Sequence, residues 1–440
     1  MRVLKDAVEN YPAWLTAIAG ARHTIFFDNY IVADDEIGRE FVGALAERAR
    51  SGVRVYAIHD WFGDLGAGSS RLWQPLIDAG GRVRRFNPPR FDSPFGWLTR
   101  DHRKLISVDG EVGFVSGLCV SKKWVGDPAR GIEAWRDTGV EVRGPAVADI
   151  DEAFAQAWAA IDSPPGEDPL PPRHIAASAG EVTLRVLATA PNMAGMYRLD
   201  QLIAAMATRT LWLTDAYFLG VAPYVQALRA AARDGVDVRL LVPGTSDVPW
   251  VSRVSRTGYR TLLEAGIRVF EWNGAMLHAK SAVADGRWAR VGSTNLNLAS
   301  WIGNYELDLA IENSGVAGTL QDMYEEDLRR STEIVLDARR RVRVAGSRSR
   351  RRHRGGSAVR AAAGALRLSH TVGAAITNRR VLGRNEAGIM ATVGVGLFAL
   401  TVIGLVWPLV LAAPLLLFGG WIGISLIARA LKLYARQPDE

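Results

Sequence analysis

Two short segments of the chain carry the same arrangement of histidine, lysine and aspartate. One consists of His102, Lys104 and Asp109, and the other of His278, Lys280 and Asp285. Side chains alternate between the two faces of a β-strand, so each histidine and its lysine are predicted to project from the same face. A single motif of this kind is more often a buried core histidine beside a surface lysine. The chain has only seven histidines, however, and the repetition indicates one shared site.

These residue types suit phosphodiester transfer. A neutral imidazole can attack phosphorus and hold it covalently, and a second, protonated imidazole can donate to the leaving alcohol and then activate the incoming one. Two lysines can neutralise the phosphate oxygens. The candidate catalytic residues are therefore His102, Lys104, His278 and Lys280, together with the motif aspartates Asp109 and Asp285. This chemistry requires no cofactor and no metal, and neither motif resembles a zinc or magnesium ligand set, because lysine is not a usual ligand.

Further polar residues follow the motifs. The turn Gly292–Asn295 contains Ser293 and Asn295, whose hydroxyl and amide groups can donate hydrogen bonds to phosphate. Asp137 and Glu306 are carboxylates that could fix the tautomer of a histidine. Either carboxylate alone would more often be a surface charge, but the doubled context favours a role at the site.

The segments that precede the motifs also occur twice. Residues 24–30 resemble 211–217, residues 44–55 resemble 227–238, and residues 76–80 resemble 262–266. The first pair is typical of buried strands, and the second of a helix that ends at a glycine and is followed by a strand. Strand, helix, strand, helix, strand in each copy predicts α/β layers with helices packed on a sheet.

A proline-rich connector separates the two copies. Five of the eleven residues 162–172 are proline, which disfavours both helix and strand. We place a first domain at residues 1–161, a linker at 162–174 and a second domain at 175–337. The first copy also contains an insertion, Pro88–Asp101, with aromatic residues directly before the motif. It is either a lid or membrane-touching loop, or a loop packed on the core.

The chain beyond residue 337 differs in character. Residues 338–378 form a basic segment with nine arginines between Arg339 and Arg354, which we interpret as a solvated linker that also tethers the protein to anionic lipid. Residues 387–428 contain no charged residue in 42 positions, and one membrane-spanning helix needs about 20 residues. We predict a transmembrane hairpin with a turn near Trp407–Pro408. Basic residues on both flanks predict that both of its ends face the cytoplasm.

The net charge of +7 is unevenly distributed along the chain. From Arg339 to Glu440 there are 17 Lys and Arg against 3 Asp and Glu, so the preceding 338 residues are net acidic. An enzyme that binds nucleic acid more often carries a basic footprint on its core, and no nucleic acid partner is expected here. The single cysteine, Cys119, cannot form an internal disulfide, which fits a reducing compartment.

The two motifs and the turn Gly292–Asn295 resemble the signature of the phospholipase D superfamily, in which His-x-Lys-x4-Asp is followed by Gly-Ser-x-Asn. Between about Tyr11 and Ile334 the order of segments is most similar to bacterial cardiolipin synthases of the short type, which lack N-terminal membrane helices. Supporting segments are Asp35–Gly38, Trp135–Asp137, Gly144–Val147 and Ala216–Phe218. The resemblance implies two tandem phospholipase D-like α/β sandwich domains related by pseudo-two-fold symmetry, with the active site at their interface.

The same resemblance implies roles for individual residues in a metal-independent ping-pong mechanism. His102 would be the nucleophile and His278 the general acid and base, while Asp109 and Asp285 would brace local structure. Phosphate would be held by Lys104, Lys280, Ser293 and Asn295, and the histidines would be oriented by Asp137 and Glu306. The sequence departs from the pattern at Cys119, which stands where the counterpart of Asn295 is expected. A thiol is a weak donor, so Cys119 is more simply a packing residue.

These features predict a phosphatidyltransferase of the cardiolipin synthase type, acting on phosphatidylglycerol or a related lipid. Its catalytic domains are expected on the cytoplasmic side of the bacterial cell membrane. Within the same chemistry the alternatives are a phospholipase D or a phosphatidyltransferase with a different acceptor. A superfamily nuclease is disfavoured by the acidic core, and a non-catalytic membrane scaffold is disfavoured by the two intact His–Lys pairs.

Overall fold

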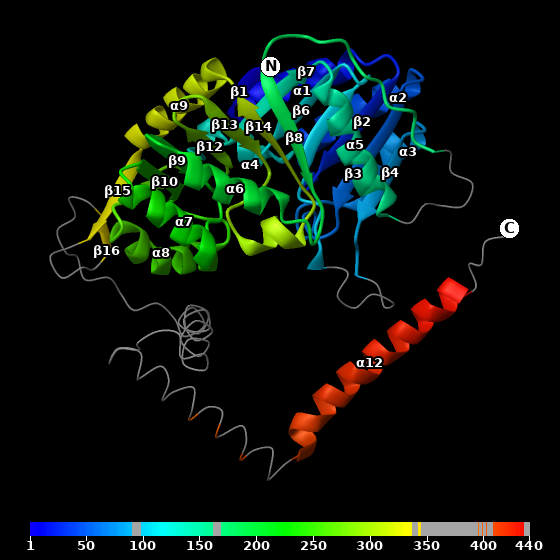
Figure 1. Ribbon diagram of the computed structural model, residues 1–440. Coiled ribbons are helices and arrows are strands. Elements are labelled where there is room, and N and C mark those ends of the chain that lie inside the picture. Colours follow the sequence, from blue (N-terminus) through cyan, green and yellow to red (C-terminus); the bar gives the residue numbers. More distant parts are fainter. Residues whose placement is uncertain are drawn as a thin grey trace. The chain divides into compact units, whose positions relative to one another are not determined.

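The computed structural model describes residues 1–89, 98–161, 169–336, 342–344, 395, 398, 402 and 408–434. They belong to two compact units (Figure 1). Unit 1 comprises Met1–Pro88 and Leu98–Ser349, and unit 2 comprises Pro89–Trp97 and Arg350–Glu440. Both His-x-Lys motifs lie in unit 1, so this unit positions the candidate site.

The first half of unit 1 is built on a seven-stranded sheet with the order β1-β7-β6-β5-β2-β3-β4. Its strands are β1 (Arg2–Lys5), β2 (Thr24–Asn29), β3 (Arg54–Asp60), β4 (Arg82–Phe86), β5 (Lys104–Val108), β6 (Val112–Ser116) and β7 (Thr138–Arg143). The helices are α1 (Asp6–Ala19), α2 (Glu36–Arg50), α3 (Gln74–Asp78), α4 (Lys122–Val125) and α5 (Ala146–Ala159). Strands β2, β3 and β4 are parallel, and α2 and α3 supply the crossovers that parallel strands need. The other strands pair antiparallel.

The second half repeats this plan on a nine-stranded sheet with the order β16-β15-β11-β10-β9-β12-β13-β14-β8. Its strands are β8 (Thr183–Thr189), β9 (Thr210–Thr214), β10 (Asp237–Pro243), β11 (Arg268–Trp272), β12 (Ser281–Ala284), β13 (Trp288–Gly292), β14 (Glu306–Glu312), β15 (Ser331–Leu336) and β16 (Val342–Val344). The helices are α6 (Gly195–Met206), α7 (Ala222–Arg233), α8 (Pro249–Leu263), the short η4 (Ala299–Gly303) and α9 (Ser314–Arg329). Strands β9, β10 and β11 are parallel. The predicted α/β layers are thus confirmed in both copies.

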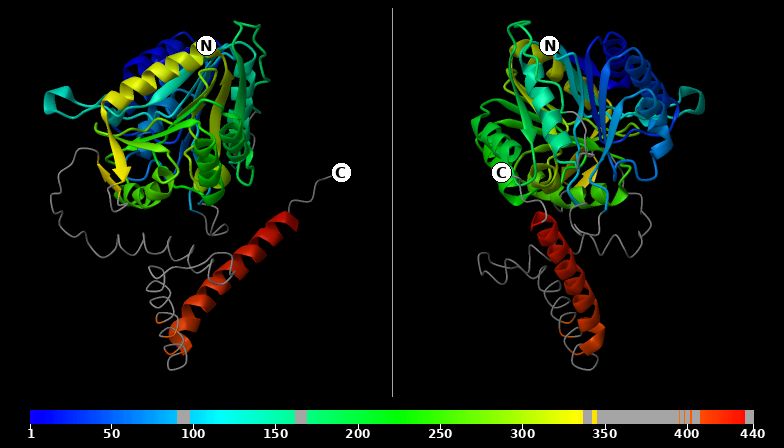
Figure 2. Two further views of the ribbon diagram at one scale, coloured as in Figure 1. Left: turned by 60° about the vertical axis from the view of Figure 1, so that its left-hand side comes forward. Right: turned by 90° about the vertical axis from the view of Figure 1, so that its right-hand side faces the viewer.

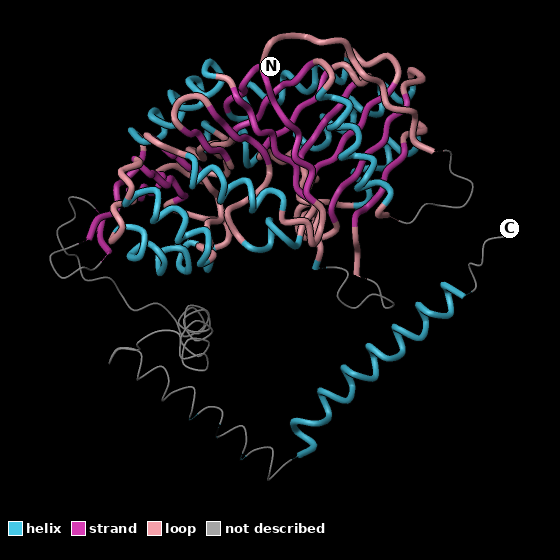
Figure 3. The backbone as a smooth tube through the Cα atoms, viewed as in Figure 1, coloured by secondary structure: helices cyan, strands magenta, loops and turns pink. Residues whose placement is uncertain are grey.

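The two halves share one apolar core. Leu105 and Val115 from the first sheet belong to the same buried cluster as Val291 and Leu307 from the second, together with residues of α5 and α9. Figure 3 shows the strands gathered in the middle of unit 1 with helices around them. Helix α9 also runs beside the beginning of the chain (Figure 2), where Lys5 donates to Glu326 at 2.6 Å. Burial of this shared surface holds the halves in register with each other.

Local signals set the ends of the repeated helices. The side chain of Asp35 accepts hydrogen bonds from the N–H groups of Ile37 and Gly38 and so caps the N-terminus of α2. Beyond the C-terminal ends of α2 and α7 lie Gly52 (φ 89°) and Gly235 (φ 96°), in the left-handed region that favours glycine. The predicted order of helix, glycine and strand is therefore confirmed.

One alignment within the predicted repeat is wrong by one residue. Strand β5 pairs Leu105 with Asp28, whereas β12 pairs the equivalent Ser281 with Thr214. The structural counterpart of Asp28 is therefore Thr214, and residues 24–30 correspond to 210–216. The triplets at 28–30 and 215–217 are similar in sequence and therefore suggested the wrong alignment. The second copy has one more residue before its tyrosine. In a strand, a shift of one residue exchanges the faces on which side chains lie.

The structure also bears on the predicted boundaries. Strand β16 pairs with β15, so the second sheet includes residues 342–344, which follow the predicted end of the second domain at residue 337. Residues 162–168 of the linker lie outside the described residues, and residues 169–174 have no regular secondary structure. The division of unit 1 into two domains remains a prediction.

In unit 2 the structure describes helix α12 (Pro408–Tyr434), which begins at the proline of the predicted turn. Residues 387–394 and most positions up to 407 of the predicted hairpin lie outside the described residues, as do most of the basic segment 338–378 and residues 90–97 of the insertion. Among the described residues, no helix is both long enough and apolar enough to cross a membrane.

Candidate active site

The first histidine lies where the chain enters β5. The N–H of His102 donates to the carbonyl oxygen of Tyr305 (2.9 Å), and the N–H of Tyr305 donates to the carbonyl oxygen of Arg100 (2.8 Å). Asp101 and Tyr305 form an isolated parallel bridge. These contacts join the two halves of unit 1 through residues 100–102 and 303–305, which are called here the strip. The strands that follow the strip in the chain are β5, which begins at Lys104, and β14, which begins at Glu306.

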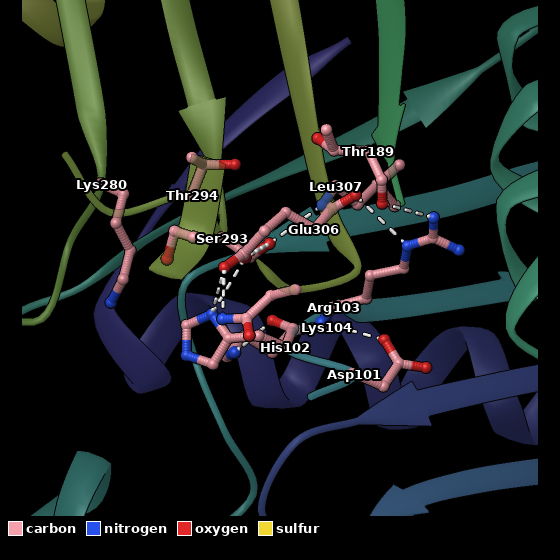
Figure 4. Close-up of polar contacts among 12 residues, drawn as sticks. Asp101, His102, Arg103, Lys104, Thr189, Lys280, Ser293, Thr294, Glu306 and Leu307 are labelled. Carbon is pink, nitrogen blue, oxygen red and sulfur yellow. Dashed lines mark hydrogen bonds and ion pairs between the residues drawn. The ribbon is translucent and has the colours of Figure 1, made fainter. Parts of the chain in front are cut away.

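Glu306 from the second half holds the imidazole of His102. Nδ1 of His102 lies 2.9 Å from Oε2 and 3.1 Å from Oε1 of Glu306. Glu306 is fully buried, and Oε2 also accepts a hydrogen bond from the hydroxyl of Ser293 at 2.6 Å (Figure 4). An ionised carboxylate only accepts, so the network assigns the proton to Nδ1 and leaves Nε2 of His102 with a free lone pair.

His278 is held in the reciprocal way by a carboxylate of the first half. Nδ1 of His278 lies 2.8 Å from Oδ2 of Asp137, which also accepts from the indole N–H of Trp124 at 2.9 Å. The backbone N–H of His278 donates to the carbonyl oxygen of Arg136 (2.7 Å). Each histidine is therefore oriented by the opposite half of unit 1, and both halves are needed to complete either pair.

The two lysines lie beside the histidines and are almost fully buried. The amine of Lys104 donates to the carbonyl oxygen of His102. The amine of Lys280 donates to the carbonyl oxygen of His278 and lies 3.1 Å from its Nε2. Neither lysine forms an ion pair within the described part of the chain. Two buried ammonium groups without a carboxylate partner favour an anionic ligand.

Burial dominates the electrostatics of the histidines. It lowers the pKa of His278 to about 4, with the charge of Lys280 adding to the effect and Asp137 opposing it. Burial likewise lowers the pKa of His102, against the influence of Glu306. Both imidazoles are therefore neutral at pH 7.

The remaining charged groups of the site respond to the same surroundings. Burial lowers the pKa of Lys280 to about 8. Burial alone would raise the pKa of Asp137 and Glu306, but their histidine partners and hydrogen bonds hold each pKa below its usual value. Both carboxylates therefore remain ionised at neutral pH, as acceptors for the imidazole N–H groups.

The motif aspartates Asp109 and Asp285 contact backbone at the other end of their strands. Asp109 accepts from the N–H groups of residues 22–24 at 2.8 Å each, and Asp285 accepts from those of residues 208–210 at 2.7–2.9 Å. Both residues have positive φ, 57° and 53°, a conformation that aspartate tolerates better than most residues. These contacts fix the start of β2 and of β9, and they match a bracing role.

The turns that follow the two motifs differ. The hydroxyl of Ser293 donates to Glu306 and so holds this carboxylate in place, while its contact with phosphate remains a prediction. Its counterpart is Gly117, where a Cβ atom would collide with Oδ1 of Asp137. Asn295 is buried, and its Oδ1 has no partner among the described residues. Cys119 packs in the core of the first half.

Aromatic residues complete the surroundings of the histidines. The rings of Tyr30 and His102 lie 4.8 Å apart, and those of Tyr217 and His278 lie 5.8 Å apart. The amines of Lys104 and Lys280 lie 5.0 Å and 5.8 Å from the centroids of the same tyrosine rings, at cation–π distance. No role was predicted for these tyrosines, although a tyrosine follows the equivalent strand in both copies of the repeat.

The chain is similar to a known protein family and to individual known proteins. A family model described as "Cardiolipin synthase, PLD-like domain" matches residues 200–328. The chain is 34% identical over 351 residues to cardiolipin synthase A of Pseudomonas aeruginosa, covering 78% of this chain and 70% of that protein. It is 32% identical over 347 residues to a cardiolipin synthase of Halalkalibacterium halodurans, covering 76% and 67%.

Two solved structures share the fold of unit 1. A phosphatidylserine synthase of Haemophilus influenzae matches with a TM-score of 0.60 and 12% identity, over 75% of this chain and 87% of that chain. A polyphosphate kinase of Porphyromonas gingivalis matches with a TM-score of 0.55 and 15% identity, over 83% and 52%. At these identities the likeness concerns the fold alone.

Proposed function

The chain belongs to the cardiolipin synthase family of phospholipase D-like proteins, and on that premise we propose that it transfers a phosphatidyl group from one phospholipid to a hydroxyl group of another. The observation that carries the proposal is the crossed pairing of His102 with Glu306 and of His278 with Asp137. It equips one buried site with two neutral, oriented imidazoles beside two lysines.

In the first half-reaction, the free Nε2 of His102 attacks the phosphorus of the donor lipid. A nitrogen–phosphorus bond forms, and the bond from phosphorus to the headgroup alcohol oxygen breaks. The other histidine, His278, gives its proton to the departing oxygen. The assignment of attack to His102 rests on the family resemblance. The two imidazoles differ in one respect, because the amine of Lys280 lies 2.9 Å and 3.1 Å from the ring nitrogens of His278, whereas the amine of Lys104 contacts the carbonyl oxygen of His102.

The protonated state of His278 depends on the substrate. In the free site, burial and the charge of Lys280 lower the pKa of His278 to about 4. A bound phosphodiester would offset the lysine charge and place a negative charge near the ring, which raises the imidazole pKa. In the second half-reaction His278 takes the proton of the acceptor hydroxyl. A new oxygen–phosphorus bond then forms and the nitrogen–phosphorus bond breaks.

The direct test is to incubate the purified full-length protein with phosphatidylglycerol in mixed micelles and to identify the products by mass spectrometry. Cardiolipin with free glycerol is expected. Phosphatidic acid without cardiolipin would instead identify water as the acceptor and the protein as a phospholipase D. Absence of both products with phosphatidylglycerol, and with phosphatidylethanolamine as a second donor, would contradict the proposed transfer.

We further propose that the C-terminal segment anchors the enzyme in the bacterial cell membrane, with the catalytic unit on the cytoplasmic side. The support lies in the sequence: nine arginines between Arg339 and Arg354 and the uncharged run 387–428. A chain that ends after residue 350 keeps β16 and is expected to move from the membrane fraction to the soluble fraction. Retention of this shortened chain in the membrane fraction after an alkaline carbonate wash, which releases peripherally bound proteins, would contradict anchoring by the tail.

A further inference from the structure

Exposed apolar side chains gather around the strip that carries His102. We infer that these residues form a docking surface through which unit 1 rests on the lipid bilayer while its substrate enters. Their exposed fractions are 45% for Phe62, 62% for Leu65, 58% for Leu98, 56% for Met193, 56% for Leu298 and 37% for Ile302. These six residues are called here the apolar rim. The inference deepens the proposed function, on which it rests for the lipid nature of the substrate.

In the first half, hydrogen bonds to the carboxylate of Asp60 connect the apolar rim to the strip. One carboxylate oxygen of Asp60 accepts from the N–H of Phe62 (2.8 Å) and from the guanidinium of Arg100 (3.0 Å). The other accepts from the N–H of Asp101 (2.9 Å). The loop with Phe62 and Leu65 is thereby tied to the residues just before His102.

In the second half, the rim adjoins the strip through η4. Leu298 directly precedes this short helix and Ile302 lies within it, three residues before Tyr305. The N–H of Asn192 donates to the carbonyl oxygen of Ile302 (2.8 Å), which places the neighbouring Met193 in the same region. Leu98 lies in the first half, two residues before Arg100. Four chain segments that are distant in sequence thus present apolar side chains around one strip.

The picture agrees with this clustering. In Figure 1 the yellow-green segment that contains the helix η4 lies along the lower edge of unit 1, whereas the green loop that precedes β8 arches over the upper edge. Soluble proteins seldom gather large exposed apolar side chains in one region unless the region binds a partner or a membrane. A lipid surface is the partner that fits, because the adjacent site acts on a phosphate group whose acyl chains remain in the bilayer.

Docking of the apolar rim would also help the lipid headgroup to reach the buried histidines. The side chain of His102 is only 11% exposed and that of His278 only 6%, so a headgroup has to leave the bilayer surface to reach them. Apolar side chains inserted at the depth of the acyl chains would shorten this path and exclude water from it. A substrate already dispersed in water gains nothing from such a surface.

The inference is tested by comparing a substrate in a bilayer with a substrate dispersed in water. The full-length protein, the double variant Leu98→Asp/Ile302→Asp and the control Ile175→Asp are compared on phosphatidylglycerol in vesicles and on short-chain phosphatidylglycerol dispersed as monomers. Ile175 is 66% exposed in the loop before β8, away from the strip. We expect the double variant to lose at least tenfold in kcat/KM on vesicles and less than twofold on monomers, with the control unchanged on both. Equal activity on vesicles, or an equal loss on both substrates, would overturn the inference.

A second measurement does not depend on catalysis. An environment-sensitive fluorophore is attached through Leu298→Cys, and in a separate sample through Ile175→Cys, in the full-length protein. Mixing with phosphatidylglycerol vesicles is expected to shift the emission to shorter wavelength at position 298 and to leave it unchanged at position 175. Unchanged emission at both positions would refute docking even if transfer activity is found. A shift at position 298 without any transfer would instead count against the proposed function alone.

Discussion

Oε2 of Glu306 lies 2.9 Å from Nδ1 of His102, although the two residues are 204 positions apart in the chain. The matching contact joins Asp137 of the first half to His278 of the second at 2.8 Å. Because each half supplies the carboxylate for the histidine of the other, neither half contains a complete histidine pair. The shared core between the two sheets is therefore a condition for catalysis as well as for stability.

The roles of the two histidines can be separated with a donor lipid whose leaving group needs no proton. His278→Ala should lose most of its activity on phosphatidylglycerol but recover the release of p-nitrophenolate from phosphatidyl-p-nitrophenol, since that anion departs without an acid. His102→Ala should fail with both donors because it lacks the nucleophile. Pre-steady-state release of p-nitrophenolate is the measurement, and rescue of His102→Ala instead of His278→Ala would reverse the assignment.

Glu306→Gln tests the crossed pairing. An amide can still contact Nδ1 but cannot stabilise a positive charge on the ring, so we expect kcat to fall about 10²- to 10⁴-fold with the fold retained. Ser293→Ala serves as a graded control, because it removes one hydrogen bond to Glu306 and leaves the carboxylate. Its loss of activity should be smaller. Equal kcat for Glu306→Gln and the unmodified protein would show that the carboxylate is dispensable.

The activity should decline on the alkaline side as Lys280 loses its charge. Its pKa of about 8, lowered by burial, means that the ammonium form predominates at pH 7 and is lost as the pH rises through 8. We expect kcat/KM on a monomeric substrate to fall above pH 8. Lys280→Arg should keep its charge throughout this range, so its activity, although lower, should show no such decline. A decline of the same shape in this variant would assign the titration to another group.

Asp285 should matter for stability and little for chemistry. Its hydrogen bonds to residues 208–210 hold its pKa at about 2, even though burial acts in the opposite direction. A lowered carboxylate pKa contributes stability that is complete above about pH 4 and is lost as the pH falls toward 2. Asp285→Ala should lower the free energy of unfolding by about 1–2 kcal/mol at pH 7, as measured by urea denaturation. Loss of kcat in fully folded Asp285→Ala would place the carboxylate in the reaction after all.

The thiol of Cys119 should be unreactive in the folded protein. The thiol is buried, and burial raises its pKa, so little thiolate is present at neutral pH. N-ethylmaleimide is expected to modify one cysteine per chain in urea and none in the native protein, without loss of transfer activity. Cys119→Ser should retain kcat within about an order of magnitude, as expected for a weak donor outside the reaction. Rapid inactivation of the native protein by the reagent would contradict this view.

The sequence by itself determined the candidate reacting residues and the type of fold. The spacing within the two His-x-Lys motifs and the order of strands, helices and glycines are local properties, governed by backbone periodicity and by the conformations that glycine and aspartate adopt. They predicted the α/β layers and the candidate catalytic residues. They also singled out Asp137 and Glu306 as carboxylates able to orient a histidine.

Only the tertiary structure decided which of these groups meet. The packing of two sheets on one core brings Glu306 to His102 and Asp137 to His278, and no local spacing encodes a contact over such separations. The hydrogen-bond register of the paired strands shows that the counterpart of Asp28 is Thr214, one residue from the predicted counterpart. The close approach of Asp137 explains a glycine at position 117, where the other half has a serine that holds Glu306.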